Sequence, residues 1–501
     1  MDLGQVLSQG GKIYFIGIKG TGMCALAELL CLGGAAVSGS DCADVFYTDE
    51  ILKDLEIPYY ETFQRAHVPP DAAVVIHSAA YAPETNPEMA EAQRLGLPLV
   101  KYADALGAYS ALFDSAGIAG VHGKTTTTAM AGVLFQALAL PAQVLAGSAV
   151  EAFGGRSTLS LGDTYFAAET CEYRRHFLAF HPQRVVLTSV ESDHQDYFPR
   201  YEDIRDAFLE YVLKLPPGGE LVYCADDRGA GEVVELASRR RGDIAVIPYG
   251  FSAPGDYRVV DYEVRDERIH FNLAGRRGAG GPGPFKLRVP GRHCALDAAA
   301  ALALAGVLIK KERGVNLLDS AGLLKEAIRA LEGFTGSRRR SEIIGEAGGV
   351  LFMDDYGHHP TAIKATLQGL REFYPQRRLV VSFMSHTYSR TAALLEEFAA
   401  SLLPADVVFL HKIYASAREH YTGGVNGRTL YEKTAEVFAA SGSAGRVFYT
   451  EEPEDAAGEL RGLLRAGDLF ITLGAGDNWR LGKKLLKGRA LPGGIPVGGG
   501  L

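Results

Sequence analysis

Short apolar runs alternate with amphipathic or Ala/Leu-rich stretches over most of the chain. In the first part, apolar runs at 12–16, 35–38, 74–77 and 97–100 accompany a helical pattern at 25–32. Strands that alternate with helices in this way are typical of a parallel sheet covered by helices. The first part therefore predicts an α/β domain that begins with a strand–helix–strand unit.

The same alternation continues through the rest of the chain. In the middle part a helical pattern at 130–140 precedes three expected strands, at 165–169, 184–190 and 220–224. The interval 250–290 has short strand patterns and a Gly/Pro cluster, so we expect antiparallel strands with an exposed tip there. The elements expected in the last part lie at 349–353, 361–373, 378–383, 392–402, 406–410 and 469–473.

Length and turn-rich punctuation divide these elements into domains. A chain of 501 residues suggests about three domains. We expect domains at 1–110, 111–333 and 334–488, followed by a flexible Gly/Pro tail at 489–501. The predicted fold class is α/β throughout: a Rossmann-like first domain, a central P-loop ATPase-type domain, and a Rossmann-like, doubly wound third domain.

Composition and charge exclude several classes of protein. Apolar residues make up 47% and charged residues 22% of the chain, which is ordinary for a globular protein. A net charge of −9 provides no basic field for nucleic acid, and the run Arg338-Arg339-Arg340 is too short to supply one. None of the six cysteines forms a C-x-x-C pair, which favours reduced thiols.

The chain shows no targeting or membrane pattern. Its N-terminus lacks a basic segment followed by an apolar core, so no signal peptide is expected. The longest apolar stretch, 298–309, is too short to cross a bilayer. We therefore expect a cytoplasmic protein without membrane insertion.

The strongest chemical signal is a glycine-rich loop that enters a helical pattern. Its candidate ATP-binding residues are Gly120, His122, Gly123, Lys124, Thr125 and Thr126. Backbone N–H groups of such a loop can surround nucleotide phosphates, with the lysine on the phosphates and the first threonine on Mg²⁺. Ile118 stands where the general motif has glycine, and a plain Gly-rich turn is the alternative. We interpret the loop as a site for ATP and Mg²⁺.

A second glycine loop follows the first expected strand and contains Gly17, Gly20 and Gly22. An acidic residue about 20 positions later completes the arrangement used for dinucleotides, but Lys19 stands where the middle glycine belongs. The pattern is weak evidence for NAD, and indicates a loop that can approach a pyrophosphate closely. Polar residues expected at the same sheet edge are Asp41, His77 and Ser78.

Several blocks, taken together and in this order, resemble the Mur ligases of peptidoglycan synthesis. They are Gly17–Met23, Gly39–Asp41, Val121–Thr127, Glu169–Phe177, Asp193–His194, Asp354–Pro360, His386–Arg390 and Gly474–Asp477. The resemblance spans about residues 12 to 485, and the block at 169–177 is similar to one alanine-adding branch of the family. Ser189 and Asp297 depart from it, because the family usually has Asn at both positions.

The resemblance implies a reaction and its partners. An alanine-adding member ligates L-alanine to the lactyl carboxylate of UDP-N-acetylmuramate through an acyl phosphate, with ATP and Mg²⁺. A ligase that recycles a preformed tripeptide is the alternative within the family. Outside it, an NAD(P)-dependent oxidoreductase would leave the loop from Gly120 to Thr126 (the phosphate loop) unexplained. A general P-loop NTPase or kinase would leave the second glycine loop, with Gly17, Gly20 and Gly22, without a role. Monomer and homodimer both remain open.

The resemblance also implies roles for individual residues. The implied catalytic residues are Lys124, Glu172 and His194. Thr125, Glu172 and His194 would bind the metal, although a neutral histidine is an unusual ligand for a hard ion and His194 could instead contact the acyl phosphate. Further ATP contacts would come from His293, Arg340 and Asp355. The glycines of the second loop, with Asp41, His77 and Ser78, would hold the UDP part, and His386, Arg390 and Arg418 would face the amino acid.

Overall fold

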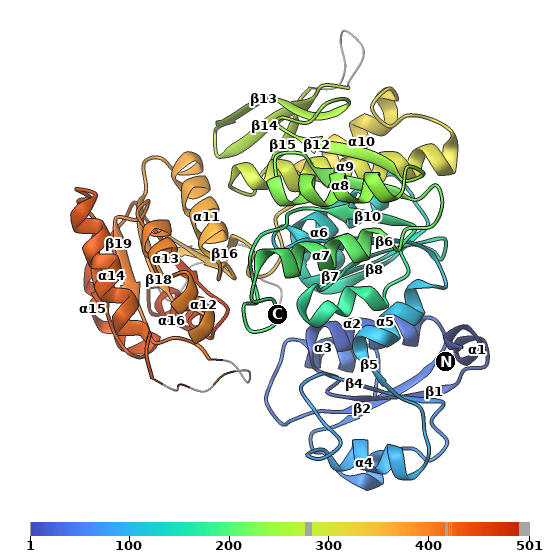
Figure 1. Ribbon diagram of the computed structural model, residues 1–501. Helices are drawn as coiled ribbons and strands as arrows, with labels where there is room; N and C mark the ends of the chain where they lie inside the picture. Colours follow the sequence, from blue (N-terminus) through green and yellow to red (C-terminus); the bar gives the residue numbers. More distant parts are fainter. Residues whose placement is uncertain (1, 276–282, 416–418, 420, 422, 490–501) are drawn as a thin grey trace.

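The computed structural model describes residues 2–275, 283–415, 419, 421 and 423–489. They form three sheets, each built from a consecutive part of the chain and each covered by helices (Figure 1). This arrangement confirms the predicted α/β class with three sheets. Below, the three parts are called the first, central and third lobes.

The first lobe contains a five-stranded parallel sheet in the order β3-β2-β1-β4-β5. Its strands are β1 (Lys12–Ile16), β2 (Ala36–Ser40), β3 (Tyr59–Tyr60), β4 (Val74–His77) and β5 (Leu99–Lys101). Its helices are α1 (Leu3–Ser8), α2 (Thr21–Leu32), α3 (Thr48–Asp54), η1 (Arg65–His67), α4 (Pro87–Arg94) and α5 (Tyr102–Ser110). The sheet centre is β1, whose residues from Ile13 to Ile16 are fully buried, as its apolar run predicts.

The central lobe contains a ten-stranded sheet in the order β15-β14-β13-β12-β11-β10-β6-β9-β7-β8. Its strands are β6 (Asp114–Ala119), β7 (Ala142–Val150), β8 (Arg156–Ser160), β9 (Tyr165–Glu169), β10 (Arg184–Leu187), β11 (Glu220–Cys224), β12 (Ala245–Gly250), β13 (Tyr257–Arg265), β14 (Arg268–Leu273) and β15 (Phe285–Leu287). Its helices are α6 (Lys124–Ala137), η2 (Glu151–Phe153), η3 (Tyr173–Ala179), α7 (Tyr201–Val212), α8 (Arg228–Arg240), α9 (Arg292–Arg313) and α10 (Ala321–Gly333). The antiparallel pairing of β13, β14 and β15 confirms the expectation for the interval 250–290; part of its Gly/Pro cluster lies outside the described residues.

Helix α9 changes one prediction. Among the described residues it is the one helix whose length and composition would suffice to cross a membrane. The apolar stretch 298–309 noted above is only part of this helix, which extends beyond it at both ends. However, 83% of its most apolar window is buried inside the protein, where it packs against α6 and the strands β11 to β14. A core helix of a large lobe accounts for this burial.

The third lobe contains a six-stranded sheet in the order β16-β17-β21-β18-β19-β20, parallel except for the edge strand β16. Its strands are β16 (Glu342–Ala347), β17 (Val350–Asp355), β18 (Arg378–Phe383), β19 (Val407–Leu410), β20 (Arg446–Tyr449) and β21 (Asp468–Leu473). Its helices are α11 (Pro360–Phe373), α12 (Tyr388–Ala393), α13 (Leu395–Ser401), α14 (Gly427–Ala440), η4 (Pro453–Ala456), α15 (Ala457–Leu463) and α16 (Trp479–Arg489). The single helix expected at 392–402 is two helices, because Leu394 leaves the helical conformation between them.

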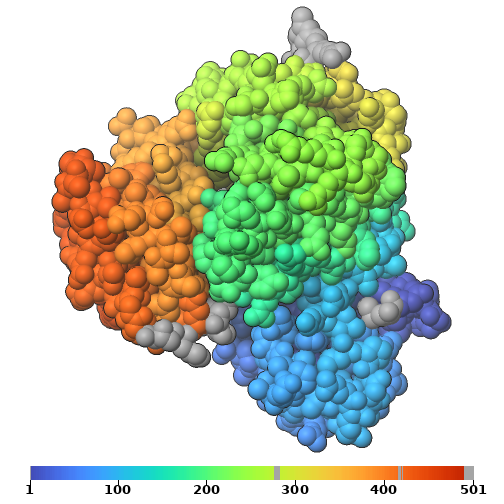
Figure 2. All heavy atoms as spheres, in the orientation of Figure 1, coloured from blue at the N-terminus to red at the C-terminus, as the bar shows by residue number. Residues whose placement is uncertain are grey.

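The central lobe lies between the other two and contacts both (Figures 1 and 2). Helix α2 of the first lobe packs against β7 and β8, and α5 packs against η3. The third lobe packs α11 against α9 and β13, and Figure 2 shows the orange third lobe resting directly on the green central lobe. The carboxyl ends of β6, β10 and β17 therefore come close to the boundary between central and third lobes.

Candidate active site

The glycine-rich loop lies between β6 and α6, as its sequence predicts. Gly123 precedes α6 with a φ of +81°, a left-handed conformation that favours glycine. A Cβ at this position would lie 2.5 Å from Oδ1 of Asp297, so the loop passes against α9 without room for a side chain. The helix begins at Lys124, which leaves the N–H groups of its first turn available to an anion.

Ser189 anchors the same loop from the end of β10. Its hydroxyl accepts a hydrogen bond from the His122 N–H at 2.9 Å, and its carbonyl accepts one from the Val121 N–H at 3.0 Å. The residue that departs from the family pattern therefore supports the backbone of the loop. The predicted strand 184–190 ends at Leu187 because the next residues turn toward this contact.

Lys124, Glu172 and His194 form one chain of polar contacts. The Lys124 ammonium donates to Oε2 of Glu172 at 2.8 Å and also contacts the Gly120 carbonyl. Nε2 of His194 lies 3.2 Å from Oε1 of the same carboxylate. Burial opposes both charges, yet each stabilises the other: the pKa of Glu172 is lowered and that of Lys124 is raised. The pair is therefore charged and ready to face phosphate groups.

His194 is held in a left-handed backbone conformation, with a φ of +54°. Such a conformation is uncommon for a residue with a Cβ and is typical of sites where a side chain must point in one direction. Its N–H donates to Oδ1 of Asp193 at 2.6 Å, which helps to stabilise the turn. The consequence is a ring aimed at Glu172.

Thr125 lies beside a carboxylate that the sequence does not single out as a site residue. Its hydroxyl donates to Oε2 of Glu169 at 2.7 Å, and Nη2 of Arg340 lies 3.4 Å from the same hydroxyl. Glu169 ends a strand, and an acidic residue at a strand end beside a phosphate loop was the one signal available. Arg340 comes from the segment between the central and third lobes, so the loop is contacted from both sides.

The central and third lobes meet in a buried ion pair. Arg390 donates from Nε and Nη2 to Oδ1 of Asp193, at 2.9 and 2.6 Å, and from Nη1 to the His386 carbonyl at 2.7 Å. Both side chains of the pair are about 4% exposed. Burial raises the pKa of Asp193, but the guanidinium outweighs this and holds the pKa well below its ordinary value. Sequence reasoning placed Arg390 at the amino acid and missed this partner.

A cavity of about 490 Å³ collects most of the predicted residues. The predicted site residues that line it are His122, Gly123, Lys124, Thr125, Thr126, Glu172, His194, His293, Arg340, Asp355, His386 and Arg390. Its walls therefore come from the phosphate loop and α9 on one side and from β17, α11 and α12 on the other. A cavity with this many convergent polar groups can hold a nucleotide and a second ligand.

Asp355 is held in place by hydrogen bonds, and His293 is neutral because it is buried. The Asp355 carboxylate accepts from the N–H groups of Ser341, at 2.6 Å, and Gly357, at 2.7 Å. These bonds orient it at the end of β17, although burial raises its pKa above the ordinary value. Burial lowers the pKa of His293 to about 4, so this ring is neutral near pH 7.

The six first-lobe residues gather at the carboxyl ends of β1, β2 and β4. They are Gly17, Gly20, Gly22, Asp41, His77 and Ser78. A Cβ on Gly17, whose φ is +89°, would lie 2.8 Å from the Tyr81 ring and 3.0 Å from Cβ of Ser78. The Lys19 N–H donates to Oδ2 of Asp41 at 2.7 Å, which ties the glycine loop to the end of β2.

The Lys19 side chain explains the missing middle glycine. It is 1% exposed, and its Nζ lies 3.1 Å from Asp49 and 3.0 Å from Glu61. A glycine in this place would lack these contacts, so the loop differs physically from the dinucleotide pattern. Nδ1 of His77 contacts the carbonyl of Ser78 at 3.0 Å, which fixes the ring direction.

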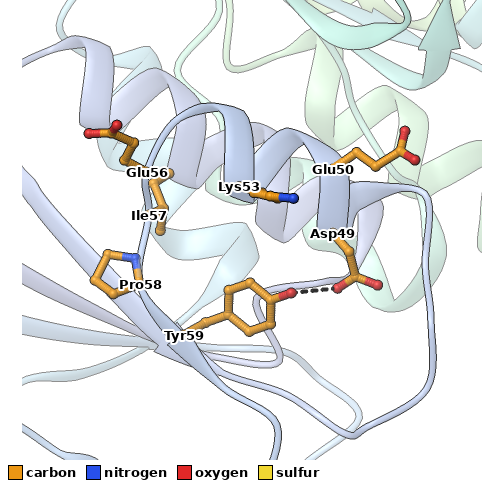
Figure 3. A pocket seen from close by; sticks show the side chains of 7 residues that line it. All are labelled: Asp49, Glu50, Lys53, Glu56, Ile57, Pro58 and Tyr59. Atoms are coloured by element: carbon orange, nitrogen blue, oxygen red, sulfur yellow. Dashed lines mark hydrogen bonds between the residues drawn. The ribbon is translucent and has the colours of Figure 1, made fainter. Parts of the chain in front are cut away.

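Two further hollows lie near these residues. A cavity of about 140 Å³ is lined by Gly22 and Tyr102 of the first lobe, and shares Glu169 and Cys171 with the large cavity. It lies between the second glycine loop and Glu169, whose carboxylate contacts Thr125 of the phosphate loop. A surface groove of about 480 Å³ at α3 and β3 is shown in Figure 3, where the Tyr59 hydroxyl donates to Asp49 at 3.0 Å. No predicted site residue lines this groove.

Two predictions lie outside the described residues. Arg418 is one, and positions 490–501 of the expected tail are the other.

The residues around Thr125 suit a hard cation. Thr125 supplies a hydroxyl oxygen, and Glu169 and Glu172 supply carboxylate oxygens, which are the ligands that Mg²⁺ prefers. His194 supplies a nitrogen, a poorer match for such an ion. The donor set therefore fits magnesium through its oxygens.

Three family models together match most of the chain. They are "Mur ligase family, catalytic domain" at residues 12–114, "Mur ligase middle domain" at 118–305 and "Mur ligase, glutamate ligase domain" at 339–476. Among curated proteins, the UDP-N-acetylmuramate–L-alanine ligase of Treponema pallidum (strain Nichols) is 55% identical and covers 95% of this chain and 96% of its own length. The enzyme of the same name from Borreliella burgdorferi is 36% identical, over 94% of this chain and 97% of its own.

Solved structures agree on the fold. The UDP-N-acetylmuramate–alanine ligase of Thermotoga maritima aligns with a TM-score of 0.73 at 23% identity, covering 95% of this chain and 98% of its own. A murein peptide ligase from Psychrobacter arcticus aligns with a TM-score of 0.64 at 22% identity, over 95% and 98% of the two chains. At these identities the likeness concerns the fold.

Proposed function

The chain belongs to the Mur ligase family, and from this premise we propose that it joins L-alanine to the lactyl carboxylate of UDP-N-acetylmuramate with ATP. The observation that carries the proposal is the cavity between the central and third lobes, in which the phosphate loop faces the Glu172 carboxylate and the Arg390 region. The curated relatives that share 55% identity over 95% of the chain favour L-alanine over a preformed tripeptide.

The proposed reaction has two steps. A lactyl carboxylate oxygen attacks the γ-phosphorus of ATP, the bond from that phosphorus to the bridging oxygen breaks, and ADP leaves with the electron pair. The amino group of L-alanine then attacks the acyl carbon, gives up a proton, and the bond to phosphate breaks with release of inorganic phosphate. The protein must position the reactants and neutralise phosphate charge.

The residues of the phosphate loop supply that neutralisation. The charged Lys124 lies 2.8 Å from Glu172, so its ammonium is fixed at the mouth of the loop rather than free in solvent. Arg340 brings a second cation to the Thr125 hydroxyl from the opposite wall. We assign both cations to the β- and γ-phosphates, together with Gly120, His122, Gly123 and Thr126 of the loop.

We assign the metal position to Thr125 and Glu172, with His194 beside them. When bound there, Mg²⁺ would supply positive charge next to the transferring phosphoryl group. Glu169 orients the Thr125 hydroxyl, and His194 orients the Glu172 carboxylate through its 3.2 Å contact. These contacts hold the oxygen donors in place before any substrate arrives.

The second glycine loop receives the diphosphate of the sugar nucleotide in this proposal, near Gly17, Gly20 and Gly22. Asp41, His77 and Ser78 lie at the nucleotide end of the same sheet edge. His293 of the central lobe faces the base in this proposal. In the third lobe, Asp355 faces the ATP ribose, and His386 and Arg390 face the amino acid, with Arg418 as a further candidate. The cytoplasm is the proposed location, with these substrates as the partners.

Phosphate release tests the proposal. Full-length protein would receive ATP, Mg²⁺, UDP-N-acetylmuramate and L-alanine, each omitted in turn. Release that does not depend on both the sugar nucleotide and the amino acid would contradict the ligase assignment. A higher rate with the tripeptide L-alanyl-γ-D-glutamyl-meso-diaminopimelate than with L-alanine would contradict only the choice of amino acid.

Lys124→Ala separates the two glycine loops. Without the ammonium that neutralises phosphate charge, release should fall by about two orders of magnitude or more, whereas UDP-N-acetylmuramate binding measured by calorimetry should change little. Lys53→Ala is the matched control, since Lys53 is exposed in the groove of Figure 3. Equal loss of sugar-nucleotide binding in Lys124→Ala would refute the division of roles.

A further inference from the structure

A second group of potential metal ligands lies in the large cavity, apart from Thr125 and Glu172. Among the described residues, His122, Glu191 and His359 each place one ligand atom within 4.8 Å of the other two. His122 belongs to the phosphate loop, and Glu191 follows β10, both in the central lobe. His359 caps the N-terminus of α11 in the third lobe. The group therefore spans the boundary between two lobes.

The three side chains converge on one point. Oε1 of Glu191 is in contact with Nε2 of His122 and lies 3.7 Å from Nδ1 of His359. The two imidazole rings have centroids 5.1 Å apart and are tilted by 47°. The Thr361 hydroxyl donates to the other carboxylate oxygen at 2.9 Å, which turns Oε1 toward the rings.

Some polar atoms of these three side chains have no hydrogen bond within the described part of the chain. Nε2 of His122 and Oε1 of Glu191 are buried and contact each other without hydrogen-bond geometry, and Nε2 of His359 is a buried atom without a hydrogen-bond partner among the described residues. Nδ1 of His359 accepts from the Thr361 N–H at 3.4 Å. Unpartnered buried polar atoms are costly and call for a ligand or an ion.

We propose that His122, Glu191 and His359 form a binding site for a borderline divalent cation, best matched by Zn²⁺, which links the central lobe to the third lobe. Two imidazoles and one carboxylate are a common protein ligand set for zinc with an open fourth position, whereas Mg²⁺ disfavours nitrogen ligands. Tetrahedral coordination with bonds of about 2.0 Å separates ligand atoms by about 3.3 Å. Small side-chain movements from the present separations would reach that geometry.

The site has a structural consequence. His359 reaches the cavity from α11, the helix through which the third lobe packs on α9 and β13. A metal ion held there would add a bond between lobes, so it should resist their separation. The fourth position would face the cavity and could take water or a phosphate oxygen.

Cobalt(II) is the appropriate probe, because it occupies zinc sites and reports tetrahedral geometry by its visible absorption. Metal-free, full-length protein without nucleotide would be titrated with CoCl₂. We expect one equivalent to produce an intense tetrahedral spectrum that Zn²⁺ abolishes. His359→Asn, which keeps a residue able to cap α11, and Glu191→Gln should each weaken binding by about 10-fold to 100-fold or more.

Matched variants keep the interpretation unambiguous. His181→Ala removes an exposed histidine of the central lobe, and Glu172→Gln removes the carboxylate beside Lys124; both should keep the spectrum. Zn²⁺ should raise the melting temperature of the wild type but not of His359→Asn, and a chelator should reverse the rise. Because no ATP is present, the outcome is independent of the ligase proposal.

Three results would overturn the site. They are equal Co²⁺ affinity in the wild type and His359→Asn, a weak octahedral spectrum, or a thiolate charge-transfer band that assigns the metal to cysteine.

Discussion

Asp297→Asn should make the central lobe more stable at alkaline pH and should have a smaller effect at acidic pH. Asp297 lies on the buried face of α9, and its Oδ1 accepts a hydrogen bond from the Thr127 hydroxyl at 3.2 Å. Burial raises the pKa of this carboxyl from 3.8 to about 7. The folded protein therefore holds a proton there that the unfolded chain loses above about pH 4.

The pKa difference of Asp297 between the folded and unfolded states sets the sign and size of the pH effect on the free energy of unfolding. Between about pH 4 and 7 the folded state binds more protons at Asp297 than the unfolded state, so the free energy of unfolding falls as pH rises. Integrated from pH 5 to 8, the loss is about 2.5 kcal/mol. Asn keeps an oxygen acceptor for Thr127 and cannot ionise, so the variant avoids this loss. Any cost of its extra amide N–H groups is the same at both pH values.

Thermal unfolding of full-length protein at pH 5 and pH 8 measures the effect. For a lobe of this size, 2.5 kcal/mol corresponds to about 5–10 °C, so the melting temperature of Asp297→Asn relative to wild type should rise by that amount between the two pH values. Asp163→Asn, an exposed carboxylate of the same lobe, is the control and should show no such change. An Asp297→Asn difference that is equal at both pH values would refute the raised pKa.

Three further substitutions test the contacts that build the site. Arg390→Met leaves the buried Asp193 carboxylate without its partner, so it should lower the free energy of unfolding by about 3–5 kcal/mol and expand the molecule in X-ray scattering. The control Arg239→Met, in an exposed ion pair, should cost under about 1 kcal/mol. An unchanged melting temperature of Arg390→Met would contradict this prediction. Lys19→Gly introduces the middle glycine of the dinucleotide motif but removes the contacts of Lys19 to Asp49 and Glu61. Calorimetry should show sugar-nucleotide binding weakened by about tenfold, or about 1.4 kcal/mol, and no gain of NAD binding. Binding of NAD by the variant would refute this account of Lys19. Glu169→Gln keeps an acceptor for the Thr125 hydroxyl but removes a negative charge. The Mg²⁺ concentration needed for half-maximal phosphate release should therefore rise about tenfold. An unchanged concentration would place the metal elsewhere.

The fold was predictable where apolar runs are long and central. The strand expected at 12–16 has the same bounds in the structure, because central parallel strands are buried on both faces. The strands β7 and β12, which lie inside the central sheet, were not among those expected. The edge strands β8, β16 and β20 were also missed. They are short, partly exposed and contain polar or glycine residues, as in Glu342–Ala347, so they have no continuous apolar signal.

The site was predictable as far as one motif reaches. Gly123, Lys124 and Thr125 are consecutive residues of the phosphate loop, so the local sequence already shows that they lie close together. The partner of Arg390 does not, because Asp193 lies 197 positions away and meets it only when the third lobe packs on the central lobe. The sequence does not reveal which oppositely charged side chain Asp193 or Arg390 contacts, since the chain carries 51 basic and 60 acidic residues.

The Asp193–Arg390 pair links the packing of the lobes to the chemistry of the site. Asp193 accepts two bonds from Arg390 and one from the His194 N–H, and the His194 ring in turn contacts Glu172 beside Lys124. Removing the third lobe would expose the Asp193 carboxylate and weaken the turn that aims His194, since Arg390 is the cation nearest to that carboxylate among the described residues. The arrangement of Glu172 and His194 around Lys124 therefore depends on the third lobe being packed in place. A carboxylate substrate that contacts Arg390 would have to share its guanidinium with Asp193, so amino-acid binding and the orientation of Glu172 should be energetically coupled.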